Sequence, residues 1–123
     1  MWDAAERNDL ALVLELLRQG AELEWRNPLD GTTPLAWACS EGSYEAAEAL
    51  CAHGAELDTR DKYQNTPLIL AAINGHPNIC AMLLALGADP SLKDKYGDTA
   101  LDKARRRNKP ECVALLQPVT PSS

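Results

Sequence analysis

The sequence predicts an all-α solenoid, a stack of similar helix–turn–helix units, on three observations. A motif recurs every 33 residues, glycines recur in phase with that motif, and the chain has few aromatic residues. Phe is absent and aromatic residues make up 5% of the 123 residues, so a core must come mainly from Leu, Ala and Ile, which helices pack readily. This composition argues against a β-sandwich or barrel, and 46% hydrophobic with 24% charged residues indicates a single globular domain.

The repeat appears when the sequence is shifted by 33 residues against itself. The shift aligns three triplets, which are Thr33-Pro34-Leu35, Thr66-Pro67-Leu68 and Thr99-Ala100-Leu101. A shift of 34 residues relates Gly54-Ala55 to Gly20-Ala21, which predicts one extra residue between Ala21 and Thr33.

Each triplet predicts the start of an inner helix. A Thr hydroxyl can accept a hydrogen bond from an unpaired N–H of the first turn, and Pro34 and Pro67 then occupy positions where a missing N–H costs nothing. Gly42 and Gly75 are expected to end these helices with a positive φ, and Asn8 and Asn108 to do so in the first and last units.

Apolar residues at helical spacing predict an outer helix in each unit. Their stripes are Leu10, Val13, Leu16 and Leu17; Ala46, Ala47, Leu50 and Cys51; Ile79, Cys80, Leu83 and Leu84; and Cys112, Val113 and Leu116. Gly20, Gly54 and Gly87 close the first three outer helices, and residues 22–32, 56–65 and 89–98 connect them to the next inner helix. In such a chain each unit buries its apolar face only against its neighbours.

The motif resembles that of the ankyrin-repeat family. Residues 33–38 and 66–71 match its T-P-L-H-x-A signature except at the His. The resemblance implies β-hairpin fingers between the helix pairs and four repeats, at about residues 1–27, 28–60, 61–93 and 94–117, with the first and last acting as caps. The expected domain is therefore 1–117, and residues 118–123 are expected to form a disordered tail.

Three departures from the family pattern carry expectations of their own. The His is replaced by Ala36, Ile69 and Asp102, which predicts weaker capping of the inner helices. Gln64 stands where the finger turn usually has Gly, which predicts a different turn in the second finger. The last inner helix carries several basic residues, as a polar outer cap should.

Charge excludes several classes of partner. The net charge is −6 and the pI about 4.8, so the overall field repels nucleic acid and anionic lipid, and we expect neither as a partner. Acidic residues are concentrated in the first half: residues 1–59 contain 12 acidic and 3 basic residues, and residues 60–123 contain 6 acidic and 9 basic residues. No apolar run reaches the roughly 18 residues of a membrane span, and residues 1–10 carry four charges, so we expect a cytoplasmic protein, with the nucleus as the alternative.

The four cysteines, Cys39, Cys51, Cys80 and Cys112, form no C-x-x-C and no zinc-type spacing with histidine. Each lies in an Ala- and Leu-rich helical pattern, which favours a small buried side chain over a disulfide or a catalytic thiol. We expect no metal and no cofactor.

A stack of this kind offers no deep pocket or lid, so catalysis is disfavoured. It offers instead a rigid concave groove of inner helices and fingertips, which suits binding of another protein or a peptide by a monomer. The family resemblance implies the same role, as an adaptor or scaffold. The predicted contact residues are Trp25, Leu29, Trp37, Ser40, Glu41, Lys62, Tyr63, Asn65, Ile73, Asn74, Lys95, Tyr96, Arg106 and Arg107.

Several of these residues have a second interpretation. Trp25 is either a binding anchor or a cover for the extra residue of the first finger, and Trp37 is either half-exposed in the groove or part of the core. Tyr63 and Tyr96, each preceded by a lysine, form a fingertip ladder for an acidic or aromatic-rich peptide, or they stack between neighbouring fingers. Both can hold at once.

Two sets of basic residues are expected to be structural or solvated. Arg26, Arg60 and Lys93 recur in register, and the Asp61 and Asp94 that follow predict local salt bridges. The cluster Arg105-Arg106-Arg107 with Lys109 could attract an anion, but a solvated cap is favoured.

Alternative functions remain open at this stage. The same face could block a partner enzyme, and inhibition at stoichiometric amounts would distinguish that role from adaptor binding. Residues 22–27 resemble fingers of ankyrin arrays attached to GTPase-activating domains, so the chain could be one domain of a larger signalling protein. A thiol enzyme using His53 or His76 would require a cysteine of low pKa.

Overall fold

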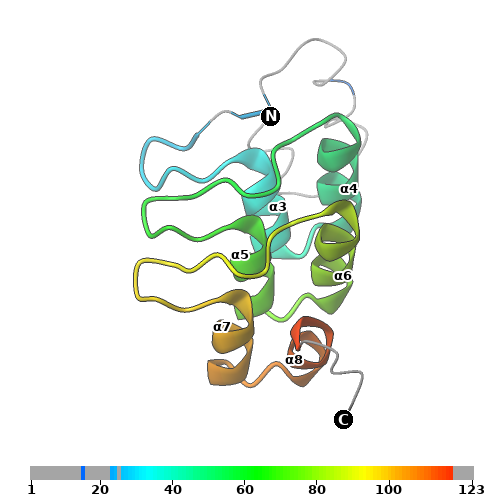
Figure 1. Cartoon of the computed structure of the whole chain (residues 1–123). Helices are drawn as coiled ribbons and strands as arrows, with labels where there is room; N and C mark the ends of the chain where they lie inside the picture. Colours follow the sequence, from blue (N-terminus) through cyan, green and yellow to red (C-terminus); the bar gives the residue numbers. More distant parts are fainter. Residues whose placement is uncertain (1–14, 16–22, 25, 118–123) are drawn as a thin grey trace.

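The computed structural model describes residue 15, residues 23–24 and residues 26–117. Within these residues the chain forms six complete helices (Figure 1). They are α3 (Pro34–Glu41), α4 (Tyr44–Ala52), α5 (Pro67–Ile73), α6 (Pro77–Leu86), α7 (Ala100–Arg106) and α8 (Pro110–Leu116). Apart from Glu15, which is helical, the predicted first helix pair lies outside the described residues, together with Asn8, Gly20 and the predicted tail.

The helices stack in two columns. The inner helices α3, α5 and α7 pack on one another in chain order, and α6 packs on both α4 and α8 in the outer column. Each inner helix also packs on the outer helix that follows it in the chain. This arrangement confirms the predicted all-α solenoid, because the main helix contacts among residues 26–117 lie within a helix pair or between neighbouring pairs.

The inner helices begin where the repeated threonines predict. The Thr33, Thr66 and Thr99 hydroxyls each accept a hydrogen bond of 3.2 Å from the backbone N–H three residues later. In α7 the expectation of weaker capping is wrong, because Asp102 completes a capping box by accepting a 3.0 Å bond from the Thr99 N–H.

The turns between paired helices require the residues found there. Gly42 and Gly75 have φ values of 78° and 73°, and Asn108 adopts the same left-handed conformation at 55°. At Gly42 space is also limiting, because a Cβ atom would lie 2.6 Å from the His76 ring. That ring forms a 3.1 Å hydrogen bond between its Nε2 and the Ser40 carbonyl oxygen, which ties the end of α3 to the start of α6.

The fingers on one side of the stack end in three tight turns, which we call the fingertips: residues 27–32, 61–65 and 94–98 (Figure 1). Each is closed by a backbone bond from its first residue to the carbonyl oxygen of its last. The first fingertip is one residue longer than the others, so the extra residue predicted between Ala21 and Thr33 lies there.

The expectation that Gln64 changes the turn of the second finger is wrong. Gln64 has a φ of 65°, close to the 84° of Gly97 at the same place in the third finger. Its N–H donates to the Asp61 carbonyl oxygen at 2.9 Å, as the Gly97 N–H donates to that of Asp94 at 3.0 Å. The surrounding hydrogen bonds therefore hold a non-glycine residue in a conformation that L-residues disfavour.

This observation gives a reciprocal pair of expected results. Gln64→Gly should raise the free energy of unfolding by about 0.5–1 kcal/mol, because it removes the strain of the left-handed conformation. Gly97→Gln should lower it by about 1 kcal/mol; a Cβ atom meets nothing within 4 Å there, so the cost is conformational alone. Urea denaturation of both variants measures the two changes, and a loss of stability in Gln64→Gly would contradict the explanation.

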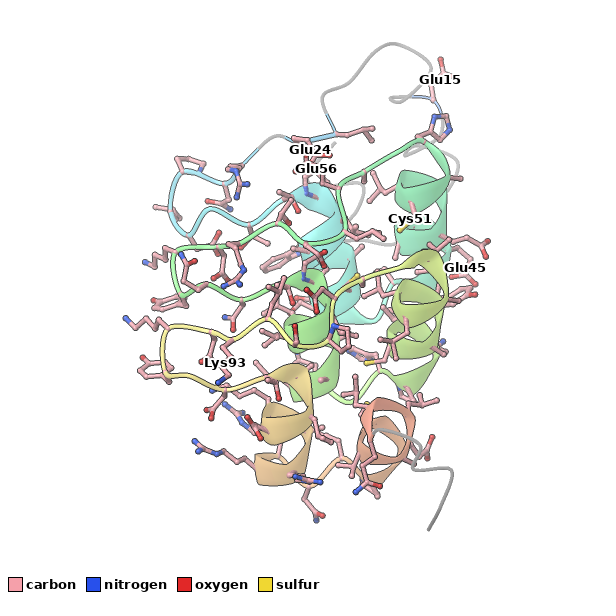
Figure 2. All side chains as sticks on the ribbon, viewed as in Figure 1. Glu15, Glu24, Glu45, Cys51, Glu56 and Lys93 are labelled. Atoms are coloured by element: carbon pink, nitrogen blue, oxygen red, sulfur yellow. The ribbon has the colours of Figure 1, made fainter. Side chains whose placement is uncertain are left out.

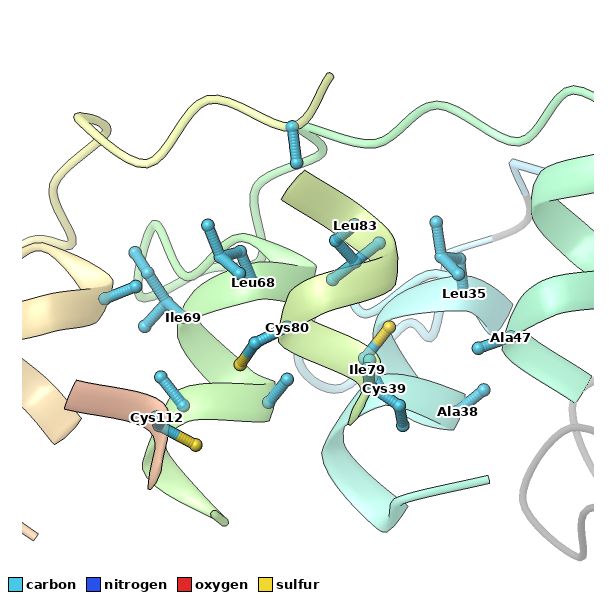
Figure 3. Packing of buried hydrophobic residues seen from close by; sticks show 14 of the residues in the cluster. Leu35, Ala38, Cys39, Ala47, Leu68, Ile69, Ile79, Cys80, Leu83 and Cys112 are labelled. Atoms are coloured by element: carbon cyan, nitrogen blue, oxygen red, sulfur yellow. The ribbon is translucent and has the colours of Figure 1, made fainter. Parts of the chain in front are cut away.

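The core is built from aliphatic residues and cysteines, as the composition predicts. The largest fully buried apolar side chains include Leu35, Leu68, Ile69, Ile79 and Leu83, and buried alanines of inner and outer helices belong to the same cluster (Figure 3). This packing fixes the inner helices and leaves their ends and the fingers exposed.

Candidate partner-binding surface

The predicted contact residues lie in two sets, one on the fingertips and one on the inner helices. Leu29, Lys62, Tyr63, Lys95 and Tyr96 are exposed at the fingertips, and Asn65 is half-buried. Of the inner-helix set, Glu41, Asn74, Arg106 and Arg107 are exposed, whereas Trp37, Ser40 and Ile73 are half-buried. Trp25 lies outside the described residues.

The fingers are tied to one another through their main chains. The Lys62 N–H donates to the Asp30 carbonyl oxygen at 2.8 Å, and the Lys95 N–H donates to that of Tyr63 at 2.9 Å. At the finger bases, the Glu24 carboxylate accepts a 2.9 Å bond from the Glu56 N–H, and the two residues lie side by side (Figure 2). Successive fingers therefore form one continuous hydrogen-bonded surface.

The expectation that Arg26 and Arg60 form local salt bridges with aspartates is wrong. Arg26 Nη1 donates to the Arg60 carbonyl oxygen at 2.8 Å, and Arg60 Nη1 donates to that of Lys93, also at 2.8 Å. Each guanidinium also binds a carbonyl oxygen of its own finger, at 3.1 Å and 3.2 Å. The two arginines thus act as clamps that join each finger to the next. The acceptor in the third finger is the main-chain carbonyl oxygen of Lys93, whose position Figure 2 shows.

The aspartates are unavailable to these arginines because the fingertips use them internally. Asp61 Oδ1 accepts bonds from the Tyr63 and Asn65 N–H groups at 2.8 and 2.9 Å. Asp94 Oδ1 does the same for Tyr96 and Asp98, at 2.9 and 3.0 Å. A carboxylate held by two backbone N–H groups fixes the turn and lies buried inside the finger.

Lys103 on α7 completes this polar network. Its Nζ lies 3.0 Å from Asp94 Oδ2 and 3.3 Å from Asp98 Oδ2, while Arg106 Nη1 lies 3.1 Å from the same Asp98 oxygen. Burial raises the pKa of Asp94, but the bonds from the Asp98 N–H and the Lys103 ammonium outweigh it and hold the pKa below 3.8. The bond to Asp94 raises the pKa of Lys103 above 10.5 against the opposing effect of burial.

The tyrosines at the fingertips contact lysines. The ammonium groups of Lys62 and Lys95 each lie 5.1 Å from the centre of the Tyr63 ring, and those of Lys95 and Lys103 lie 5.4 and 5.3 Å from the centre of the Tyr96 ring. The Lys95 ammonium therefore lies close to the rings of both neighbouring fingers, and a lysine links the two tyrosines.

The inner-helix set forms a second part of the surface. Asn74 Nδ2 donates to Ser40 Oγ at 3.0 Å, which links the ends of α5 and α3. Ile73 packs partly against the core, and Glu41 is exposed at the end of α3. Trp37 is half-buried, in agreement with partial exposure on this face.

Two residues that matter to this surface, Asp98 and Lys103, are absent from the predicted contact set. A signal for Lys103 exists in the sequence, since it stands in register with Trp37 and Leu70 and replaces an apolar residue by a cation. The sequence does not show that Lys103 forms ion pairs with Asp94 and Asp98, because these aspartates belong to the preceding finger.

The thiols lie in an environment opposite to that of a catalytic cysteine. Cys39, Cys80 and Cys112 are buried and Cys51 is half-buried, and all four are free thiols. Burial raises the pKa of Cys51 to about 11 and that of Cys80 to about 12, and it also raises the pKa values of Cys39 and Cys112. Within the described ranges there is also no cluster of His, Cys, Asp and Glu suited to a metal ion.

Thiol labelling tests this environment. At pH 8 the folded protein should react with a thiolate-specific reagent at least about 100-fold more slowly than the urea-unfolded chain, because the reactive thiolate is disfavoured. Cys51 should react first, since it alone is half-buried. Mass spectrometry of the labelled protein measures order and rate, and rapid labelling of one buried cysteine would contradict the expectation.

Comparisons with known proteins agree with this architecture. The sequence model of a family described as "Ankyrin repeats (3 copies)" matches residues 1–94. The chain is 40% identical over 58 residues to the potassium channel AKT3 of Oryza sativa subsp. japonica, and 37% identical over 58 residues to the potassium channels AKT1 of the indica and japonica subspecies. Each match covers 47% of this chain and only 6% of the channel. In the described part of this chain, none of the helices has the length and apolar character to span a bilayer.

Proposed function

Because the chain belongs to the ankyrin-repeat family, we propose that it is a protein-interaction module that binds a partner through its fingertips and inner helices, as an adaptor or scaffold. One observation carries the proposal: the exposed residues at successive fingertips are held in register by a hydrogen-bonded main chain. A surface already ordered in this way loses little conformational entropy when a partner binds.

We also propose the bounds of the module and its state in solution. The domain comprises residues 1–117 with four repeats, and residues 118–123 lie outside it. It acts as a monomer without a cofactor and without catalysis of its own, in the cytoplasm or the nucleus.

A module within a longer protein is a second form of the same function. The channel relatives match over 58 residues, which make up 6% of each channel. A similar segment therefore occurs in proteins whose other parts are far larger, and this chain could recruit a partner for a longer protein in the same way.

The experiment compares two variants with matched charge changes. Glu41→Arg with Asn74→Arg places two long cations on exposed positions of the inner-helix face, while Glu48→Arg with Ala81→Arg does the same on the outer helices. Affinity capture with wild type and the outer-helix variant should recover the same partner proteins, and the inner-helix variant should lose them. Circular dichroism confirms that both variants fold.

Equal recovery by the two variants would refute the proposed face. Recovery lost only by the outer-helix variant would place the binding surface on the opposite side of the stack.

A further inference from the structure

In the second and third fingertips the negative charge is buried and the positive charge is exposed. Each begins with the same triplet, Asp-Lys-Tyr, whose net charge is zero. Asp61 and Asp94 are 8% and 7% exposed because the backbone of their own finger binds them. Lys62 and Lys95 are exposed, and within residues 26–117 neither forms an ion pair. The tips therefore present positive charge to solvent on a protein of net charge −6.

These two lysines are also held in place. The Lys95 ammonium lies between two rings, 5.1 Å from the centre of Tyr63 and 5.4 Å from that of Tyr96, and Lys62 borders Tyr63. Exposed lysines usually lose considerable side-chain entropy on binding, and contact with a ring face reduces that loss. Tyr63 and Tyr96 are 40% and 68% exposed, so each still offers surface to a partner.

The first fingertip differs in chemistry. Pro28 and Leu29 occupy the positions of the Lys-Tyr pairs, and Leu29 is 81% exposed. The Leu29 N–H donates to Asn27 Oδ1 at 2.8 Å, just as the Tyr63 N–H donates to Asp61, so the two turns begin alike. The longer first turn also contains Asp30, whose Oδ1 accepts a 2.9 Å bond from the Thr32 N–H. The row of tips thus runs from an apolar end to a cationic and aromatic stretch.

We propose that this fingertip row binds an extended acidic segment of a partner protein, with carboxylates at Lys62 and Lys95 and an apolar side chain at Leu29. This inference rests on the proposed function and specifies the chemistry of the partner. The net charge of −6 opposes non-specific attraction of such a segment, and the basic cluster Arg105-Arg106-Arg107 with Lys109 is a competing site, which the control variant below removes in part.

A synthetic peptide provides the probe. It is a fluorescein-labelled peptide of ten residues, with leucine at both ends and glutamate at the eight positions between them. Its control carries glutamine in place of every glutamate. Fluorescence anisotropy with the full chain measures binding of both. The acidic peptide should bind at least about tenfold more tightly than the glutamine peptide, and the difference should shrink as salt is added, because exposed charges are screened.

Matched variants separate the tips from general charge attraction. Lys62→Met with Lys95→Met should weaken binding of the acidic peptide about five- to tenfold, the effect of two exposed ion pairs. Arg105→Met with Lys109→Met removes the same charge from the end of the stack, where neither residue forms an ion pair within the described residues, and should change affinity less than about twofold. Leu29→Ser should weaken binding about two- to fivefold.

Two outcomes would overturn the inference: equal binding of the acidic and glutamine peptides, or equal losses in the two double variants. Either leaves the proposed function standing if Glu41→Arg with Asn74→Arg still abolishes partner capture. If that variant also captures every partner, the interaction face itself is wrong.

Discussion

Leu83→Ala is expected to lower the free energy of unfolding by about 3 kcal/mol, the largest effect of any single change considered in this chain. Leu83 lies on α6, is fully buried, and packs within the core shared by neighbouring helix pairs (Figure 3). Truncation removes buried apolar surface and leaves a cavity that rigid neighbouring helices fill poorly. Urea denaturation followed by circular dichroism measures the loss.

The same helix supplies the control. Leu86 lies one turn later on α6 and is 53% exposed, so Leu86→Ala should change stability by less than about 0.5 kcal/mol. Both changes delete the same atoms and leave a residue of high helix propensity, so their difference reports burial alone. Similar losses in the two variants would mean that the core does not lie where the structure places it.

Lys103→Met is expected to cost about 2 kcal/mol at pH 7, because it leaves the nearly buried Asp94 carboxylate without its cation. The side chains of Asp94 and Lys103 are 2% and 15% exposed, so water replaces the lost partner poorly. Arg105→Met is the control, since Arg105 is exposed and forms no ion pair within the described residues, and it should be nearly neutral.

The cost of Lys103→Met should depend on pH in a defined direction. The pKa of Asp94 is lower in the folded protein than in the unfolded chain, so its contribution is present above about pH 4 and is lost as pH falls through the folded value. The pKa of Lys103 is raised, so its contribution is complete below about pH 10 and is lost as pH rises through the folded value. The difference between wild type and variant should therefore shrink as pH falls below about 4, and a constant difference would exclude the ion pair as its cause.

The fold could be predicted because its determinants are local and repeated. A threonine that caps a helix and a glycine with positive φ act through their own backbone, so Thr66 and Gly75 indicate helix ends without knowledge of any partner. The 33-residue period then gives the stacking, since every unit must cover the apolar face of the next.

The hydrogen bonds and ion pairs of the surface could be predicted only in part. Each charged side chain has several possible acceptors or donors nearby, and the sequence does not show which of them it contacts. Asp61 could have paired with Arg60 beside it, but two backbone N–H groups bind it more closely, and Arg60 turns to a carbonyl oxygen of the next finger. Gln64 keeps the same turn as Gly97 for a similar reason, since the hydrogen bonds around it outweigh its own conformational preference. Such competition is settled by three-dimensional geometry.

The arginine clamps have a consequence for how this protein can change over evolutionary time. Arg26 and Arg60 donate hydrogen bonds to main-chain carbonyl oxygens of the next finger, and every amino acid has such an oxygen. These bonds do not depend on the side chains of the neighbouring fingertip. Residues at a tip can accordingly be exchanged while the framework beneath them is inherited intact. Descendants of one such gene could then acquire new binding preferences by single substitutions, without an intervening loss of foldability.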